Sequence, residues 1–201
     1  MGVKAYAIAD LHLGHPGIIE YRNFATMEEH DDYVVAKINE VVNPTDYLYI
    51  LGDVVITPVG YKALAKINCQ NLILVPGNHD GERAPIHYPA YVRTIGAYTR
   101  RLLPKHREVV FTHIPVHPLT LDRWSFNIHG HLHTDTVPDY RYFCASCEQL
   151  DYKPIEMQTL RRLLEERLGM HRHDVVPVPA SSPLSAKITK VISVETVSSK
   201  E

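Results

Sequence analysis

The chain has 201 residues, of which 45% are hydrophobic and 22% are charged, so its size and composition fit one globular domain and exclude a second catalytic domain. No apolar run approaches the about 18 residues that a membrane span requires. Lys and Arg total 21 against 23 Asp and Glu, and the net charge of -2 excludes a global positive field for nonspecific nucleic-acid binding.

The first 80 residues alternate between predicted strands and predicted helices. The strands cover residues 3–10, 47–51 and 71–75, and the helices cover residues 26–43 and 57–67. Thr26 and Glu29 form a capping box for the first helix, and Thr57 is the expected cap of the second. Acidic or amide residues follow each strand. Because open α/β sheets bind ligands beyond the carboxyl ends of their strands, the functional site is expected at this edge.

The second half of the chain predicts a mixed sheet and a final helix. Four more strands are expected over residues 98–103, 108–113, 126–131 and 141–145. An amphipathic helix over residues 160–168 is expected to stop at Gly169. We expect a domain over residues 1–174 and a tail over residues 175–201. The tail fits either an added edge strand or a loosely held terminus.

Cysteine and histidine counts indicate the compartment and the chemistry. Three cysteines cannot form a disulfide framework, and residues 1–4 lack the apolar segment of a secretory signal, so we expect a cytoplasmic protein without membrane contact. Histidine is abundant, at 13 residues, which indicates metal or proton chemistry.

Candidate metal ligands follow the predicted strand ends. In chain order they are Asp10, His12, Asp53, Asn78, His79, His113, His131 and His133. Oxygen and nitrogen donors without thiolate suit Mn, Fe, Zn, Ni or Co. Residues i and i+2 of an extended segment project to the same side of the chain. Asp10 and His12 are therefore expected to face one point, and so are His131 and His133. Two divalent ions would outweigh the two carboxylates, and a net positive site favours a phosphate ligand.

These residues resemble the motifs of one enzyme family. Asp10-Leu-His12, Gly52-Asp53, Gly77-Asn78-His79-Asp80, His113 and Gly130-His131-Leu-His133 occur in the order found in the calcineurin-like metallophosphoesterases. Each motif is weak alone, but five in order are specific, and the match runs from about residue 3 to residue 133. The resemblance implies an α/β fold of the α+β type: a four-layer αββα sandwich of two mixed β-sheets flanked by helices, with the metal site at the carboxyl ends of strands.

The resemblance also implies a role for each matching residue. Asp10, His12 and His133 would hold a first metal ion, Asn78, His113 and His131 a second, and Asp53 would bridge them. The ions, about 3.5 to 4 Å apart, would share a hydroxide that attacks phosphorus in line. His79 would protonate or stabilise the leaving oxygen, and Asp80 would orient His79 and raise its basicity. Manganese is the first choice of metal, with Fe, Zn, Ni and Co left open.

Departures from the family's branches narrow the expected function. Asp53 is followed by Val-Val-Ile-Thr-Pro, not by the Asp-Arg-Gly of the Ser/Thr protein phosphatases. The chain also has no room for the DNA-capping domain of the recombination nucleases, so it looks like the small bacterial, archaeal and phage-type phosphoesterases. We expect hydrolysis of a phosphodiester or phosphomonoester in a small phosphorylated substrate. A nucleotide phosphatase or a small nuclease acting on nucleic-acid ends is the alternative, and a non-catalytic scaffold is less favoured because no ligand is missing.

Four further side chains are candidates for substrate binding. His15 and His117 lie in loops close to the first and fourth motifs, where either could contact phosphate or could be a solvated loop residue. Arg22 and Arg123 could bind the phosphate or stack on a base, although a surface arginine packed beside an aromatic ring is commoner.

Overall fold

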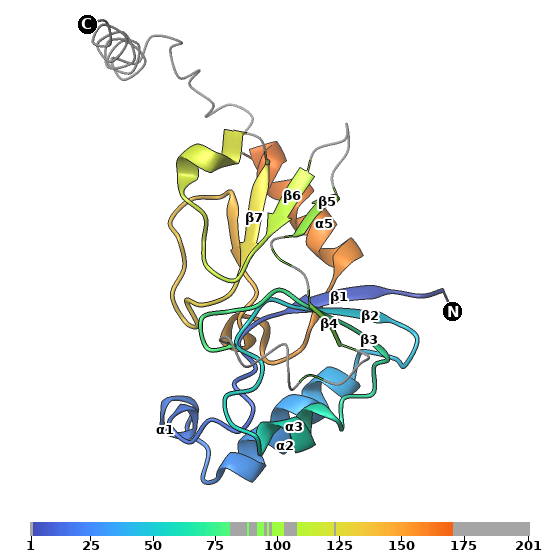
Figure 1. Ribbon diagram of the computed structural model, residues 1–201. Helices are drawn as coiled ribbons and strands as arrows, with labels where there is room; N and C mark the ends of the chain where they lie inside the picture. Colours follow the sequence, from blue (N-terminus) through green and yellow to red (C-terminus); the bar gives the residue numbers. More distant parts are fainter. Residues whose placement is uncertain are drawn as a thin grey trace, which may run out of the picture. The chain divides into compact units, whose positions relative to one another are not determined.

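The computed structural model describes residues 2–80, 88, 92–94, 96, 98–102, 108–122 and 124–170, which form two β-sheets with flanking helices (Figure 1). The strands are β1 (Ala5–Ile8), β2 (Tyr47–Ile50), β3 (Asn71–Leu74), β4 (Val92–Thr94), β5 (Tyr98–Arg101), β6 (Glu108–Phe111), β7 (Phe126–His129), β8 (Tyr142–Cys144) and β9 (Ile155–Glu156). The helices are α1 (Ile18–Arg22), α2 (Met27–Asn39), α3 (Gly60–Leu64) and α5 (Met157–Met170), with short 3-10 helices η1 (Pro118–Asp122) and η2 (Cys147–Leu150). The mixed two-sheet fold expected from the sequence is confirmed.

The first sheet has the strand order β4-β3-β2-β1-β9. Strands β1 to β4 are parallel, and the short β9 pairs antiparallel with β1, with Ala7 opposite Ile155. The strands β1, β2 and β3 lie where the sequence predicts them, whereas β4 and β9 were not predicted. Because β1, β2 and β3 run the same way, the segments that follow them leave the sheet at one edge.

Helices α2 and α3 cover one face of this sheet (Figure 1). Half of the expected capping box is present: Thr26 Oγ1 accepts the N–H of Glu29 at 3.1 Å, but Glu29 Oε2 accepts the N–H of Ala25 at 2.9 Å and not that of Thr26. Val34 and Ile38, one turn apart on α2, are fully buried against Leu48 and other sheet residues. Each such side chain contributes roughly 1.5 to 3 kcal/mol through burial.

The second sheet has the order β5-β6-β7-β8, with β5 antiparallel to β6 and the other strands parallel. Its fully buried Asn127 holds the loop after β6, because Nδ2 donates to Thr112 Oγ1 at 2.9 Å and Oδ1 accepts Val116 N–H at 2.9 Å. That loop carries His113. Helix α5 contacts the edge strand β8, where the Arg167 guanidinium donates to Tyr142 O at 2.7 Å.

The two sheets are joined beside the carboxyl end of β1. The N–H of Ala9 donates to Ala145 O at 2.8 Å, and Ala9 O accepts the N–H of Cys147 at 3.1 Å. Residues just after β1 are thereby placed against residues just after β8. The polar segments of both sheets consequently meet at one place, although they are more than 130 residues apart in sequence.

Two helix ends differ from the sequence prediction. Thr57 does not cap a helix: its hydroxyl donates to Gly14 O at 2.7 Å, and α3 begins only at Gly60. The Thr57 hydroxyl makes this tertiary contact instead of a cap, and the local sequence does not encode that contact. Gly169 does not end α5, which continues to Met170. The predicted tail, 175–201, lies outside the described residues.

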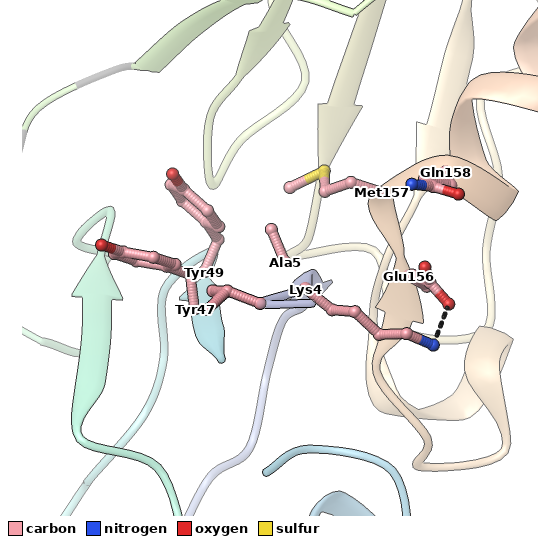
Figure 2. A pocket seen from close by; sticks show the side chains of 8 residues that line it. Lys4, Ala5, Tyr47, Tyr49, Glu156, Met157 and Gln158 are labelled. Carbon is pink, nitrogen blue, oxygen red and sulfur yellow. Dashed lines mark hydrogen bonds and ion pairs between the residues drawn. The ribbon is translucent and has the colours of Figure 1, made fainter. Parts of the chain in front are cut away.

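A pocket of about 480 Å³ opens at the amino ends of β1 and β2 (Figure 2). Lys4 and Glu156 form an ion pair of 3.1 Å on its wall. The strands deliver the candidate ligands at their opposite ends, so this pocket is separate from the expected metal site. None of the helices in the described parts of the chain has the length and apolar character needed to cross a membrane.

Candidate metal centre

Five of the expected ligands have a left-handed backbone conformation. Their φ angles are 60° for Asp10, 50° for His12, 53° for Asp53, 71° for His131 and 52° for His133. A positive φ strains a non-glycine residue by about 1 kcal/mol or more, and such strain concentrates at functional sites. The extended conformation expected for residues 10–12 and 131–133 is therefore wrong. Tertiary contacts impose these turns, and Asp10 and His12 still face one point.

Glycines beside the ligands allow the backbone to approach them closely. A Cβ on Gly77 would lie 2.3 Å from Asp53 Oδ1, and a Cβ on Gly52 would lie 2.4 Å from His113 Nδ1. A Cβ on Gly130 would lie 2.7 Å from Asp10 Oδ2. These spacings are far below contact distance, so the glycine in each motif makes room for a ligand that belongs to another motif.

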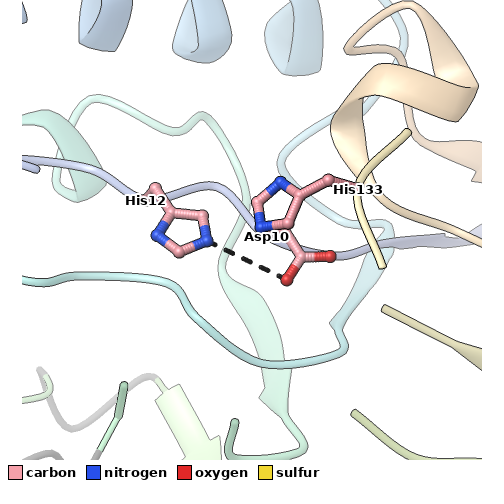
Figure 3. Close-up of side chains that lie close together, drawn as sticks. All are labelled: Asp10, His12 and His133. Atoms are coloured by element: carbon pink, nitrogen blue, oxygen red, sulfur yellow. Dashed lines mark ion pairs between the residues drawn. The ribbon is translucent and has the colours of Figure 1, made fainter. Parts of the chain in front are cut away.

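The first candidate metal group consists of Asp10, His12 and His133 (Figure 3). Its three ligand atoms lie within 4.8 Å of one another, and His12 Nε2 is 4.0 Å from Asp10 Oδ1. The Asp10 carboxylate is fully buried and accepts hydrogen bonds from Ser146 Oγ at 2.6 Å and from the N–H of His131. These hydrogen bonds fix the orientation of the Asp10 carboxylate.

The second candidate group consists of Asp10, Asp53 and His113. The Nε2 atom of His113 lies 3.5 Å from Asp53 Oδ2, and its Nδ1 donates to Leu51 O at 2.8 Å, which directs Nε2 toward the site. Asn78 Oδ1 lies 2.9 Å from the same Nε2. The His131 ring lies 5.1 Å from the His113 ring, measured between centroids. The structure thus brings all three residues expected for the second ion together.

Asp10 belongs to both groups, and Asp53, a member of the second group, lies close to His12 of the first. Its Oδ2 is 3.6 Å from His12 Nε2 and 3.5 Å from His113 Nε2. Its Oδ1 accepts the N–H of His79 at 2.9 Å, so the carboxylate cannot rotate freely. One oxygen of Asp53 therefore lies within 3.6 Å of an imidazole nitrogen from each group.

The buried nitrogens and carboxylates fit divalent metal ions. Neither His12 Nδ1 nor Nε2 has a hydrogen-bond partner among the described residues, although both atoms are buried. Burial, with Arg22 and His133 nearby, lowers the pKa of His12 to about 2, which keeps the imidazole in the neutral form that binds metal. Burial also raises the pKa of Asp10. A cation bound to one of these nitrogens would satisfy that atom and would offset the cost of burying the carboxylates.

Glu148 supports the first group and was missed by the sequence analysis. Its Oε1 accepts His133 Nδ1–H at 2.8 Å, which leaves His133 Nε2 as the free ligand atom. The hydrogen bond to Glu148 raises the pKa of His133. The same carboxylate pairs with Arg22, whose guanidinium also donates to Asp10 O at 2.7 Å and Leu11 O at 3.2 Å. No motif could reveal this link, because Glu148 lies 126 residues from Arg22.

This network corrects the expectation for Arg22. The residue is only 9% exposed, and its donors are directed to Glu148 and to the backbone after β1. Arg22 holds the strand end that carries the ligands and is not available to a substrate phosphate.

The other three candidate substrate residues have different placements. His15 lies beside the centre, with its ring centroid 5.5 Å from that of His12 and 6.1 Å from that of His79. His117 is exposed at the start of η1, where its Nδ1 accepts the N–H of Leu119 at 3.3 Å, and no contact among the described residues brings it to the centre. Arg123 lies outside the described residues.

Asp80 has a different partner from the one expected. Its carboxylate accepts the N–H groups of Asp53, Val54 and Gly77 at 2.8, 3.1 and 2.7 Å and the Tyr88 hydroxyl at 2.8 Å. No hydrogen bond between Asp80 and the His79 imidazole occurs in the described part of the chain. Asp80 instead fastens the loop after β3 to the loop after β2, because backbone N–H groups occupy its oxygens.

Gly77→Ala is expected to disrupt the centre. The added methyl group must displace the Asp53 carboxylate, so we expect a loss of about 1 to 3 kcal/mol in unfolding free energy and weaker binding of both ions. Gly96→Ala is the matched control, because its Cβ would meet no atom within 4 Å. Denaturant unfolding and metal titration of both variants provide the measurement. Normal metal binding by Gly77→Ala would contradict the close approach.

Comparisons with known proteins identify the family and relatives of this chain. A family model described as calcineurin-like phosphoesterase matches residues 3–186. The uncharacterized protein MJ1445 of Methanocaldococcus jannaschii is 28% identical over 178 residues, which cover 81% of this chain and 92% of that protein. The Gene 66 protein of Mycobacterium phage L5 is 30% identical over 161 residues, covering 64% of this chain and 77% of that protein.

A solved structure also resembles the fold. The crystal structure of AQ665, a protein of unknown function from Aquifex aeolicus, matches with a TM-score of 0.62 and 26% sequence identity, covering 81% of this chain and 100% of that one. The family match spans every motif from Asp10 to His133, and the structure gathers those motifs at one centre. The chain therefore belongs to the calcineurin-like phosphoesterase family and is a metal-dependent hydrolase of phosphate esters.

Proposed function

We propose that this protein hydrolyses phosphodiesters at a centre of two divalent metal ions. The observation that carries the proposal is the position of Asp53 Oδ2, which lies within 3.6 Å of a histidine nitrogen from each ligand group. In this proposal Asp53 bridges the ions. Asp10, His12 and His133 hold one ion, and Asn78, His113 and His131 hold the other.

The donor set also bears on the metal. Carboxylate, amide and imidazole donors favour manganese in this proposal, and Fe, Zn, Ni or Co could occupy the same ligands. When bound, the ions would supply Lewis acidity to the phosphate and a water acidic enough to act as the nucleophile near neutral pH. The chain's own task is to hold the ligands in place, which Glu148, Ser146 and the backbone of His131 do by hydrogen bonds.

His79 is proposed to protonate the leaving oxygen. Its side chain is exposed, while its backbone N–H is held by Asp53 Oδ1. The imidazole therefore stands at the open edge of the centre, where an imidazolium can donate a proton as the ester P–O bond breaks. Asp80 contributes by holding the loop that carries His79.

The first experiment compares bis-p-nitrophenyl phosphate with p-nitrophenyl phosphate, using metal-stripped protein with Mn, Ni, Zn or Mg added back separately. We expect diester turnover that requires added metal and disappears with chelation. A preference for the monoester would redirect the search to nucleotides and phosphorylated metabolites. No turnover of either ester by protein that holds both ions would contradict the proposed catalysis and favour a metal-binding scaffold.

His79→Ala is expected to slow unactivated esters more than activated ones. General acid catalysis contributes about 10²- to 10⁴-fold and matters most for a poor leaving group, whereas p-nitrophenolate leaves with little help. We expect kcat for a series of aryl phosphodiesters to depend more steeply on the pKa of the leaving phenol in the variant. Equal loss across the series would show that His79 acts mainly by another route, such as binding phosphate.

The proposal includes a cytoplasmic location and a small phosphorylated substrate, with a nucleotide or a nucleic-acid end as the alternative. The cytoplasmic location is supported by the cysteines, because free thiols persist in reducing compartments. Those of Cys69, Cys144 and Cys147 are free and buried. Fractionation with a thiol-reactive label applied under denaturing conditions checks this point, and oxidised cysteines in the native host would contradict it.

A further inference from the structure

His15 occupies a position that determines its tautomer. Its Nδ1 lies 2.9 Å from the N–H of Gly17 and 3.1 Å from the N–H of Ile18, at the turn that leads into α1. Both backbone groups are donors, so Nδ1 must present a lone pair to them. The single ring proton of the neutral imidazole is therefore on Nε2, and Nε2 is a hydrogen-bond donor.

The His15 ring lies beside the candidate centre. Its centroid lies 5.5 Å from that of His12, a ligand of the first ion, and 6.1 Å from that of His79, the proposed general acid. The side chain is half-buried, and no described residue accepts a hydrogen bond from Nε2. This donor lies beside the place where phosphate is expected and has no hydrogen-bond partner among the residues that the structure describes.

We infer that His15 Nε2–H donates a hydrogen bond to a phosphate oxygen of the substrate. This inference rests on the proposed function and adds a substrate-binding residue to it. The ring is locked on its Nδ1 side by two backbone groups, so little rotamer freedom is lost when phosphate binds. The donor is also neutral in this tautomer, so it would add no charge to a centre that would hold two cations.

Two substitutions separate this role from capping of the α1 turn. In His15→Asn the amide Oδ1 can replace Nδ1 as acceptor for Gly17 and Ile18, but the distal donor is lost. In His15→Gln the longer amide keeps a donor near the position of Nε2, but it loses the acceptor at the turn. If His15 only capped the turn, His15→Gln would be the more damaging change.

The measurement is titration of manganese-loaded protein with inorganic phosphate by calorimetry, together with kcat/KM for bis-p-nitrophenyl phosphate and the metal content of each variant. A hydrogen bond to a charged group accounts for about 10- to 100-fold in affinity. We expect His15→Asn to keep two ions and wild-type thermal stability, while its phosphate affinity and kcat/KM fall by about that factor. We expect His15→Gln to keep phosphate affinity within about threefold of wild type and to unfold at a lower temperature.

The inference is overturned if His15→Asn holds two ions and binds phosphate like the wild type. It is also overturned if His15→Asn loses an ion, since His15 would then act through the first metal group, or if metal-loaded wild-type protein binds no phosphate. A wild-type protein that hydrolyses neither ester, but binds phosphate more tightly than His15→Asn, would refute the proposed catalysis and leave the His15 contact standing.

Discussion

Asp53→Asn is expected to reduce hydrolysis at least about a thousandfold, which corresponds to roughly 4 kcal/mol of lost transition-state stabilisation. The variant keeps Oδ1, which accepts the N–H of His79, and asparagine tolerates the left-handed backbone at this position. It loses the charged Oδ2 that lies between His12 and His113. We expect bound metal to fall from two ions to one or fewer per chain, measured by elemental analysis after gel filtration.

The stability of the same variant gives an independent check. In metal-free protein Asp10 and Asp53 are buried carboxylates in one ligand group, so removing one charge relieves repulsion. Metal-free Asp53→Asn should therefore melt at the same or a higher temperature than metal-free wild type, whereas added manganese should stabilise the wild type more. Asp46→Asn is the matched control, because Asp46 is equally buried but bonds to Lys4 and Asn43 at the far end of the sheet. Full retention of both ions by Asp53→Asn would contradict the bridging position.

Glu148→Gln is expected to weaken binding of the first ion by about 10- to 100-fold, the usual cost of losing a carboxylate behind a metal-bound histidine. The variant keeps Oε1, the oxygen that accepts both His133 Nδ1–H and the Arg22 guanidinium, but it loses the negative charge that strengthens both contacts. Arg22, whose side chain is 1% exposed, is left without its counter-charge, so we expect the unfolding free energy to fall by about 3 kcal/mol. Competitive metal titration and denaturant unfolding measure the two effects.

Glu40→Gln is the matched control for that variant. Glu40 also pairs with a basic residue, Lys153, but its side chain is 45% exposed, and exposed pairs contribute about 0 to 1 kcal/mol. It should change neither metal affinity nor the melting temperature appreciably. Wild-type affinity for both ions in Glu148→Gln would mean that His133 does not need Glu148 to orient its ring.

Local patterns predicted the strands that lead into the centre. The apolar runs that became β1, β2 and β3 end where polar residues begin, and the Thr26 cap begins α2 at the expected place. These features depend on neighbours within about four residues, so periodicity and capping rules can predict them. The two-residue β9 was not predicted, because it exists only where β1 offers an edge. Thr57 was misassigned for the same reason, since its hydroxyl bonds to Gly14, 43 residues away.

The sequence by itself determined which donors are available and in what order, from Asp10 and His12 to His131 and His133, and this order was enough to indicate a phosphoesterase. Only the tertiary structure decided how the donors are held. Five ligands lie in left-handed turns. They are held by contacts between segments far apart in the sequence: Ser146 bonds to Asp10, and Glu148 links His133 to Arg22. Such contacts follow from which strand ends lie side by side, and no periodicity within a single segment encodes that choice.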